Sequence, residues 1–188
     1  MAGSKKRDDI LRAALKLIVE HDLDQTSMDM IAKEAQVGMG TIYNYFPSKE
    51  NLVNQLYREL QGQLLQAILK DYSDDAPIRE QFFTVVRNKF YFYLRHPDIA
   101  QFIERYAYSP IISYESDEEP QKMWQVPLQI MERGKKQQIL KDLPVQVLII
   151  LNSSAIYSLV QEHQRGRIQL DENLIEETIS ACWDAIKL

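Results

Sequence analysis

The stretch that decides the fold is residues 26–52, which read TSMDMIAKEAQVGMGTIYNYFPSKENL. The hydroxyls of Thr26 and Ser27 can cap the free N–H groups of a new helix. Apolar residues then recur at the spacing of one helical face: Met28, Ile31, Ala32 and Ala35. We expect Gly38 to take the left-handed conformation that a tight turn needs. A second helix follows over 39–46, and Pro47 ends it. The pattern predicts a helix-turn-helix over about 28–46.

The second helix of this pair carries an outward face rich in hydrogen-bonding groups. At about 100° per residue, Ile42 and Phe46 point the same way and must face the protein. The opposite arc presents Thr41 and Asn44, flanked by Tyr43 and Tyr45. In a major groove, such flanking hydroxyls reach the phosphate walls while the central side chains meet base edges. The alternative is an ordinary amphipathic helix with a half-buried aromatic pair.

The predicted DNA contacts extend to the residues at the helix starts. Lys49 begins the third helix, where free N–H groups and the positive helix end favour a phosphate. Gly40 removes a side chain where backbone and DNA would come close. The predicted DNA-binding set is Thr26, Ser27, Gly38, Met39, Gly40, Thr41, Tyr43, Asn44, Tyr45 and Lys49.

This segment resembles the DNA-binding domain of the TetR (tetracycline-repressor-like) family of bacterial transcriptional regulators. The resemblance covers about residues 7–55 and rests on Ile10, Ala13, Ala14, Leu17, Thr26, Ile31, Ala32, Ala35, Val37, Gly40, Thr41, Ile42, Tyr43, Tyr45, Phe46, Lys49, Glu50 and Leu52. One departure is Gly38, because the family usually has alanine or a small hydroxyl residue there. The resemblance implies a DNA-binding domain over 1–55 and a domain over 56–188 that binds an inducer and dimerises.

The charge balance is unusual for a DNA-binding protein. The chain has 22 Lys+Arg against 27 Asp+Glu, a net charge of −5. We therefore expect binding by shape and a modest set of phosphate contacts. The basic run Lys5, Lys6, Arg7 either lies along a phosphate backbone or belongs to a disordered terminus. The single cysteine, the lack of a signal peptide and the short apolar runs predict a cytoplasmic protein without a membrane partner.

The rest of the chain is predicted to be helical, because no window shows sustained period-two alternation. The fold class is therefore all-α, with about nine helices. The predicted helices beyond the motif span about 48–72, 77–95, 98–106, 121–138, 144–164 and 172–186. Pro127 should either kink its helix or mark the true start. We expect the loop 109–119, with its acidic end, to be mobile.

The last two predicted helices carry more apolar and small residues than one face needs. A helix of this kind buries two faces. It either lies in the middle of its own domain or meets its symmetry mates in a four-helix bundle. Helix-turn-helix readers usually work as dimers, which favours association. The predicted homodimer interface is Leu151, Ser154, Ala155, Ser158, Ile175, Ile179, Cys182 and Trp183.

The middle of the chain is rich in aromatic residues. Large planar side chains leave gaps, and such gaps hold apolar ligands. We predict an effector pocket that opens near the 109–119 loop and is lined by Phe82, Val86, Phe90, Tyr93, Phe102, Tyr106, Trp124 and Tyr157. The candidates for its polar end are Arg87, Glu104 and Arg105.

Two other function classes are alternatives to a DNA-binding regulator. An enzyme is disfavoured, since the sequence lacks a Gly-x-Ser-x-Gly turn, a glycine-rich phosphate loop and His-Glu-x-x-His. The three histidines are scattered, so neither a metal nor another cofactor is expected. A helical protein-interaction module without DNA binding is the alternative. The function favoured is a repressor that binds a palindromic operator in double-stranded DNA as a dimer and is released by a small apolar or aromatic effector.

Overall fold

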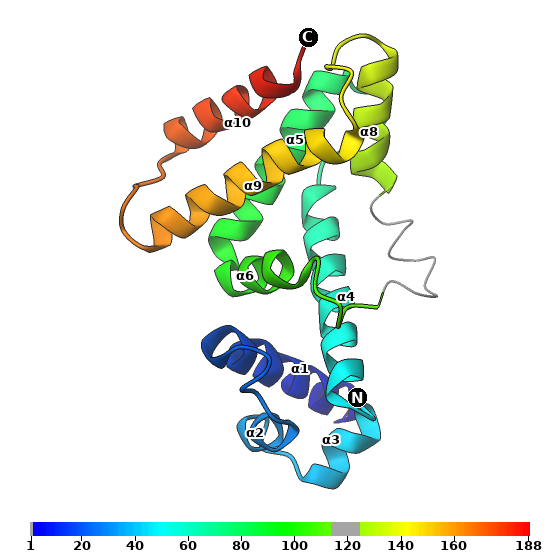
Figure 1. Cartoon of the computed structure of the whole chain (residues 1–188), viewed down its shortest axis with the longest axis vertical. Coiled ribbons are helices and arrows are strands. Elements are labelled where there is room, and N and C mark those ends of the chain that lie inside the picture. Colours follow the sequence, from blue (N-terminus) through cyan, green and yellow to red (C-terminus); the bar gives the residue numbers. More distant parts are fainter. Residues whose placement is uncertain (1, 114–124) are drawn as a thin grey trace. The chain divides into compact units, whose positions relative to one another are not determined.

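The computed structural model describes residues 2–113 and 125–188. Within these ranges the chain forms nine α-helices and no strand beyond one isolated bridge between Leu140 and Lys187 (Figure 1). The helices are α1 (Ala2–His21), α2 (Met28–Glu34), α3 (Met39–Tyr45), α4 (Lys49–Ile68), α5 (Ile78–Arg95), α6 (Pro97–Tyr106), α8 (Gln125–Lys136), α9 (Val145–Gln164) and α10 (Glu172–Ile186). The predicted all-α class is confirmed.

The described residues form two compact units. The first comprises 2–61 and 98–113, and the second comprises 62–97 and 125–188. Residues 98–113, which the sequence assigned to the second domain, therefore pack with the first unit. The hydroxyl of Tyr106 accepts a hydrogen bond from the Leu23 amide at 3.2 Å. The side chain of Asn54 donates to the Ile111 carbonyl and accepts from the Ser113 amide, both at 2.8 Å.

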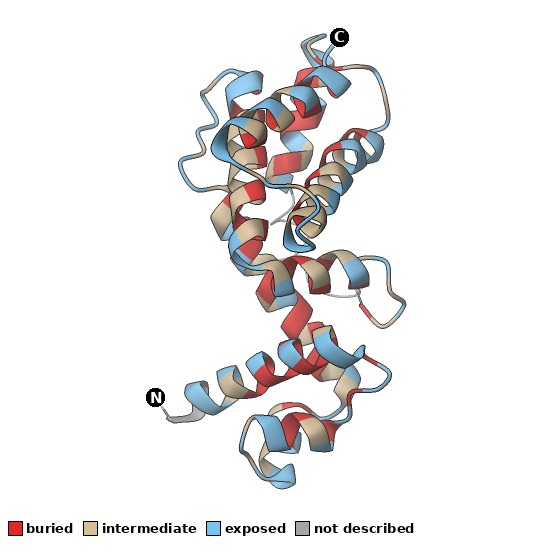
Figure 2. Cartoon of the chain, turned by 90° about the vertical axis from the view of Figure 1, so that its left-hand side faces the viewer, coloured by how far each residue is buried: buried red, intermediate tan, exposed pale blue. Residues whose placement is uncertain are grey.

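The first unit has a core made by the inward faces of α1, α2, α3 and α4, marked as buried in Figure 2. Its fully buried side chains include Ile10, Ile18, Ile31, Ile42, Phe46 and Leu52. Ile31, Ile42 and Phe46 are among the positions whose helical spacing predicted an inward face. Their burial fixes which faces of α2 and α3 remain at the surface.

The second unit is built around α5, which packs against α8, α9 and α10 (Figure 1). Phe82, Phe90 and Tyr93 on α5 are almost completely buried, and Trp183 of α10 lies 5.2 Å from Phe82 between ring centroids. At one end of this core, Arg133 donates to Gln81 Oε1 at 2.7 Å and to the Tyr72 hydroxyl at 3.0 Å. This network ties α8 to the start of α5.

Several helix ends differ from their predicted positions. The helix beginning near Ser48 ends at Ile68 rather than Tyr72, because the chain turns there and Asp71 has a positive φ of 59°. Pro127 lies in the first turn of α8, where its missing N–H costs no helical hydrogen bond. Residues 5–7 belong to α1, so they form neither a separate arm nor a disordered terminus.

Candidate nucleic-acid interface

The turn between α2 and α3 is made by Gln36, and not by Gly38 as predicted. Gln36 has φ of 55°, whereas Gly38 has φ of −74° and extended backbone as the N-cap of α3. The Gln36 amide donates to the Lys33 carbonyl, and the Val37 amide donates to the Ala32 carbonyl. This pair of bonds is a Schellman motif, which satisfies the last carbonyls of a helix. The chain therefore turns one residue after the C-cap, earlier than expected.

Helix α3 presents the outward face expected of a recognition helix. Ile42 and Phe46 are 0% exposed and hold the helix on the core, as predicted. Tyr43 is 48% exposed and Asn44 is also exposed, while Thr41 and Tyr45 are half-buried. A Cβ atom on Gly40 would meet nothing within 4 Å, so packing within the chain does not require a glycine there. The polar side chains of α3 thus lie on the surface.

Thr26 and Ser27, the two predicted capping residues before α2, have different roles. Ser27 is the N-cap and accepts a hydrogen bond from the Met30 amide at 3.2 Å, with its own side chain exposed. Thr26 is 1% exposed, and its hydroxyl donates to the Asp22 carbonyl at 2.8 Å. The structure gives this side chain a role in holding the loop before α2. The prediction of Thr26 as a DNA contact stays a prediction.

Lys49 makes contacts that sequence spacing did not reveal. Its ammonium group donates to the Leu23 carbonyl at 2.6 Å and to the Thr26 carbonyl at 2.8 Å. The side chain thus fastens the loop between α1 and α2 to the start of α4. The predicted phosphate contact of Lys49 stays a prediction, but this residue already has a structural role. Both contacts span more than twenty residues of sequence, so no local pattern could have announced them.

Arg7 packs against the C-terminal end of α3, on the side of the helix that faces the protein. Its guanidinium donates to Glu59 at 2.8 Å and to Gln55 at 3.3 Å. It also lies 5.9 Å from the centroid of the Phe46 ring, a distance suited to a cation–π contact. Arg7 therefore links α1, α3 and α4, which differs from the phosphate-lying arm considered for the basic run.

The predicted self-association residues fall into two groups. On α10, Ile175, Ile179, Cys182 and Trp183 are at most 7% exposed in the single chain, because this face packs on α5. These four residues have a packing role within the chain, and their part in an interface stays a prediction. Burial also raises the pKa of the Cys182 thiol.

The predicted residues on α9 lie nearer the surface. Leu151, Ser154 and Ser158 are exposed, and Ala155 is half-buried. Two further apolar residues of α9 that the prediction omitted, Val147 and Ile150, are also exposed.

Most residues predicted to line an aromatic pocket have packing contacts in the structure, and the pocket itself stays a prediction. Phe82, Phe90 and Tyr93 lie in the core of the second unit, and the tilted rings of Phe102 and Tyr106 lie 5.0 Å apart between centroids in the first. Tyr157 lies edge-on to Tyr93, and Trp124 lies outside the described residues. Of the predicted set, Val86 alone lines the apolar pocket described in the second unit.

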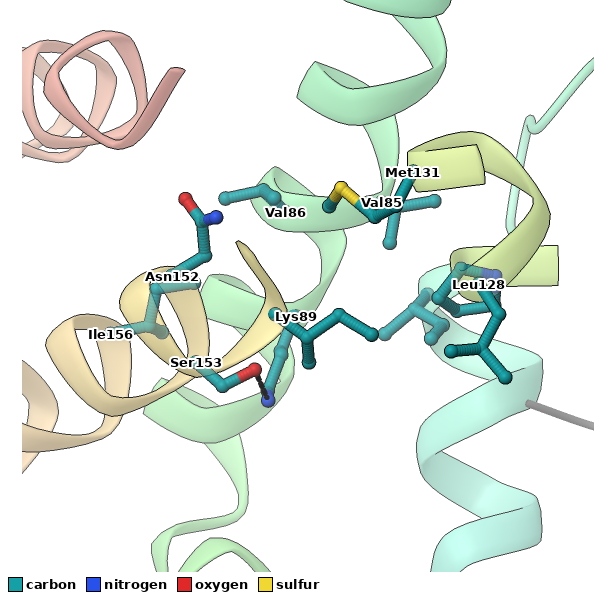
Figure 3. Close-up of a pocket in the computed structure, with 11 residues that line it drawn as sticks. Val85, Val86, Lys89, Leu128, Met131, Asn152, Ser153 and Ile156 are labelled. Carbon is teal, nitrogen blue, oxygen red and sulfur yellow. Dashed lines mark hydrogen bonds between the residues drawn. The ribbon is translucent and has the colours of Figure 1, made fainter. Parts of the chain in front are cut away.

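Two residues predicted for the polar end of the pocket, Arg87 and Arg105, form ion pairs with other side chains. Arg87 forms a two-pronged ion pair with Glu176, both bonds at 2.6 Å. Arg105 is ion-paired with Asp22 in the first unit. One pocket in the described part of the second unit is lined mainly by aliphatic residues (Figure 3).

Two further features bear on the class of protein. In residues 2–113 and 125–188, no group of three or more His, Cys, Asp or Glu side chains has the arrangement of a metal site. Among the same residues, α9 is the one helix long and apolar enough to cross a membrane by composition. Such a helix also occurs in protein cores, and α9 packs against α5, α8 and α10.

A helix-turn-helix with its second helix exposed on the surface is typical of DNA-binding transcriptional regulators. The family model "Bacterial regulatory proteins, tetR family" matches residues 10–56. The model "Tetracyclin repressor-like, C-terminal domain" matches residues 77–187, more than half of the chain. The chain belongs to the TetR family. TetR-family proteins are transcriptional regulators rather than enzymes, as predicted.

Individual relatives agree with this assignment. An HTH-type transcriptional regulator of Haemophilus influenzae is 26% identical over 180 residues, covering 96% of this chain and 95% of the relative. A crystal structure of a TetR-family regulator from Marinobacter aquaeolei has a TM-score of 0.90 at 25% identity, covering 98% of this chain and 96% of the other. A TetR-family protein from Vibrio parahaemolyticus has a TM-score of 0.80 at 32% identity, covering 97% and 99%.

Proposed function

We propose that this regulator is a cytoplasmic repressor that binds a palindromic operator as a homodimer and leaves it when a small molecule binds. The observation that carries the DNA part is the exposed polar face of α3 above a fully buried Ile42 and Phe46. Only two or three of its side chains can read bases, which is too few for specificity from one copy. Two copies on paired half-sites would double the contacts, with half-site centres about 34–36 Å or a multiple apart.

The proposed dimer uses the exposed face of α9. Val147, Ile150 and Leu151 are 39%, 48% and 46% exposed in the single chain. With Ser154 and Ser158 they follow helical spacing along one side of α9. An apolar stripe edged by small residues lets a second helix approach closely and loses contact with water on association.

The DNA-binding test is a mobility shift on genomic DNA fragments, followed by footprinting of the selected site. Thr41→Ala or Asn44→Ala should weaken binding to the selected DNA more than binding to unrelated DNA. The expected difference is about 1–3 kcal/mol for each lost base contact. Tyr43→Phe should weaken binding to both DNAs about equally, since a phosphate contact carries no sequence information. A footprint over one asymmetric half-site, or no shift at all, would contradict the proposal.

The dimer test compares three variants by light scattering. Leu151→Glu places a charge on the exposed stripe and should give folded monomers with weakened operator binding. Gln164→Glu adds the same charge at the exposed end of α9 and should stay dimeric. Ile179→Glu buries the charge inside one chain and should unfold the second unit instead. A folded, dimeric Leu151→Glu variant would refute the proposed interface.

A further inference from the structure

Two large apolar side chains lie at the surface of α3. Met39 is 39% exposed and Tyr43 is 48% exposed, and the two residues lie one helical turn apart. Among the large apolar side chains that the structure describes in the helices of the first unit, these two alone are exposed. A single exposed apolar residue is ordinary on a protein surface. This pair, however, lies on the helix that reads DNA in the proposed function.

The Met39 side chain has free space on both sides. Met39 is the first residue of α3, and glycines precede and follow it in the sequence. A Cβ atom added at Gly38 or at Gly40 would meet nothing within 4 Å. Neither neighbour brings a side chain of its own. Met39 is therefore the one long side chain among residues 38–41.

This position on α3 is suited to base contact. When a recognition helix lies in the major groove, its first residues are the ones that contact base edges. On α3 these are Met39, Gly40 and Thr41, of which Thr41 is short and half-buried. Methionine is unbranched and has three rotatable bonds, so its end adapts to the surface it meets. Met39 thus has the longest reach toward a base at this end of α3.

The chemistry of methionine determines which base it favours. In the major groove guanine, adenine and cytosine present hydrogen-bond donors and acceptors, whereas thymine also presents its C5 methyl group. Methionine has no donor, and its thioether sulfur is a weak acceptor. Against the other three bases it would exclude water from polar groups and return no hydrogen bond, which is unfavourable. Against thymine it covers a methyl group, and both apolar surfaces leave water.

We propose that Met39 gives this regulator a preference for thymine at one base pair of the half-site that α3 reads. The Met39 side chain contacts the thymine C5 methyl group, while Tyr43 keeps the phosphate contact proposed for its hydroxyl. This contact rests on the proposed function, because α3 must read DNA for it to form. Burial of one methyl-sized apolar group changes an affinity by roughly fourfold, which sets the effect expected for each half-site.

The experiment replaces thymine by uracil, which removes the C5 methyl group and keeps the O4 acceptor. The full chain first selects a site from a pool of random DNA duplexes. Synthetic duplexes of that site then carry deoxyuridine in place of one thymidine at a time, and fluorescence anisotropy gives each affinity. Replacement at the thymine that Met39 contacts should weaken binding by roughly fourfold, and replacement in both half-sites by roughly fifteenfold.

Three variants assign the effect to Met39. Met39→Ala should bind the thymine and uracil duplexes about equally, because its side chain is too short to cover the methyl group. Met39→Leu keeps an apolar side chain of similar volume and should retain most of the ratio between the two affinities. Met30→Ala is the matched control, since it makes the same change at a half-buried position of α2 and should leave the ratio unchanged.

A fourth variant tests the choice of base. Met39→Gln has a side chain of similar length with an amide that can bond to adenine N6 and N7. A repeated selection with this variant should therefore replace the methyl-sensitive thymine by adenine. Retention of thymine at that position would count against a direct contact of residue 39 with the base.

The ratio of the two affinities distinguishes contact from folding, because a folding defect weakens binding to both duplexes alike. The same ratio in wild type and Met39→Ala overturns the inference. Specific binding without any methyl-sensitive thymine also overturns it and leaves the proposed function intact. A Met39-dependent ratio under a single asymmetric half-site upholds the contact and refutes the palindromic dimer. Failure to select any duplex refutes both.

Discussion

Replacing Lys49 by methionine should destabilise the first unit rather than merely remove a phosphate contact. In the structure the Lys49 ammonium donates to the carbonyls of Leu23 and Thr26 at 2.6 and 2.8 Å. Methionine preserves much of the apolar stem and removes both donors. The two carbonyls belong to residues that are 8% and 1% exposed, so water replaces the lost donor poorly.

The expected magnitude follows from these two bonds. A buried polar group left without its partner costs about 1–3 kcal/mol. Lys49 itself is half-buried, which lets some water reach the vacated space. We therefore expect a loss of about 2–4 kcal/mol for the pair, a large share of the roughly 5–15 kcal/mol that stabilises a typical domain.

The assay is urea unfolding of the full chain, combined with operator affinity measured over a range of salt concentrations. The free energy of unfolding should fall, and the slope of log affinity against log salt reports the predicted phosphate contact separately. Lys33→Met is the control, because the Lys33 side chain is 75% exposed and pairs with Asp29 at the surface of α2. Unchanged stability with a slope reduced by about 0.9 would refute the reasoning, since that result is the signature of a phosphate contact.

Three further variants test local features. Gln36→Gly should raise the free energy of unfolding by about 0.5–1 kcal/mol in denaturant titrations, because glycine adopts the positive φ at this C-cap without strain. Gly134→Ala should lower the melting temperature, at a cost of about 1–3 kcal/mol, since its Cβ would lie 2.6 Å from Leu140 Cδ1. Hydrogen bonding to Arg87 lowers the pKa of Glu176, so its ion pair stabilises the fold above the unfolded carboxyl pKa and that contribution is lost as pH falls through the lowered value. Both side chains are more than a third exposed, so Glu176→Gln should cost less than about 1 kcal/mol near pH 7 and nothing at acidic pH.

Local patterns determined the helices and the orientation of the recognition helix. Capping residues, apolar spacing and Pro47 act within a few residues of one another, so they can be interpreted without knowing the fold. Ile42 and Phe46 had to face the core because no other apolar stripe exists on α3. The Schellman turn at Gln36 escaped prediction because nothing in a glutamine side chain announces a left-handed backbone.

Tertiary packing decided which buried face meets which neighbour. The apolar stripe of α10 requires burial, but its spacing is the same whether the partner is α5 or a second copy of the chain. Thr26 and Lys49 suit a phosphate by side-chain chemistry, and only the folded loop between α1 and α2 brings their donors to buried carbonyls. Likewise, sequence shows how many aromatic residues must pack, whereas the place left unfilled depends on how all of them fit together. In the described part of the second unit, one such place lies among aliphatic side chains.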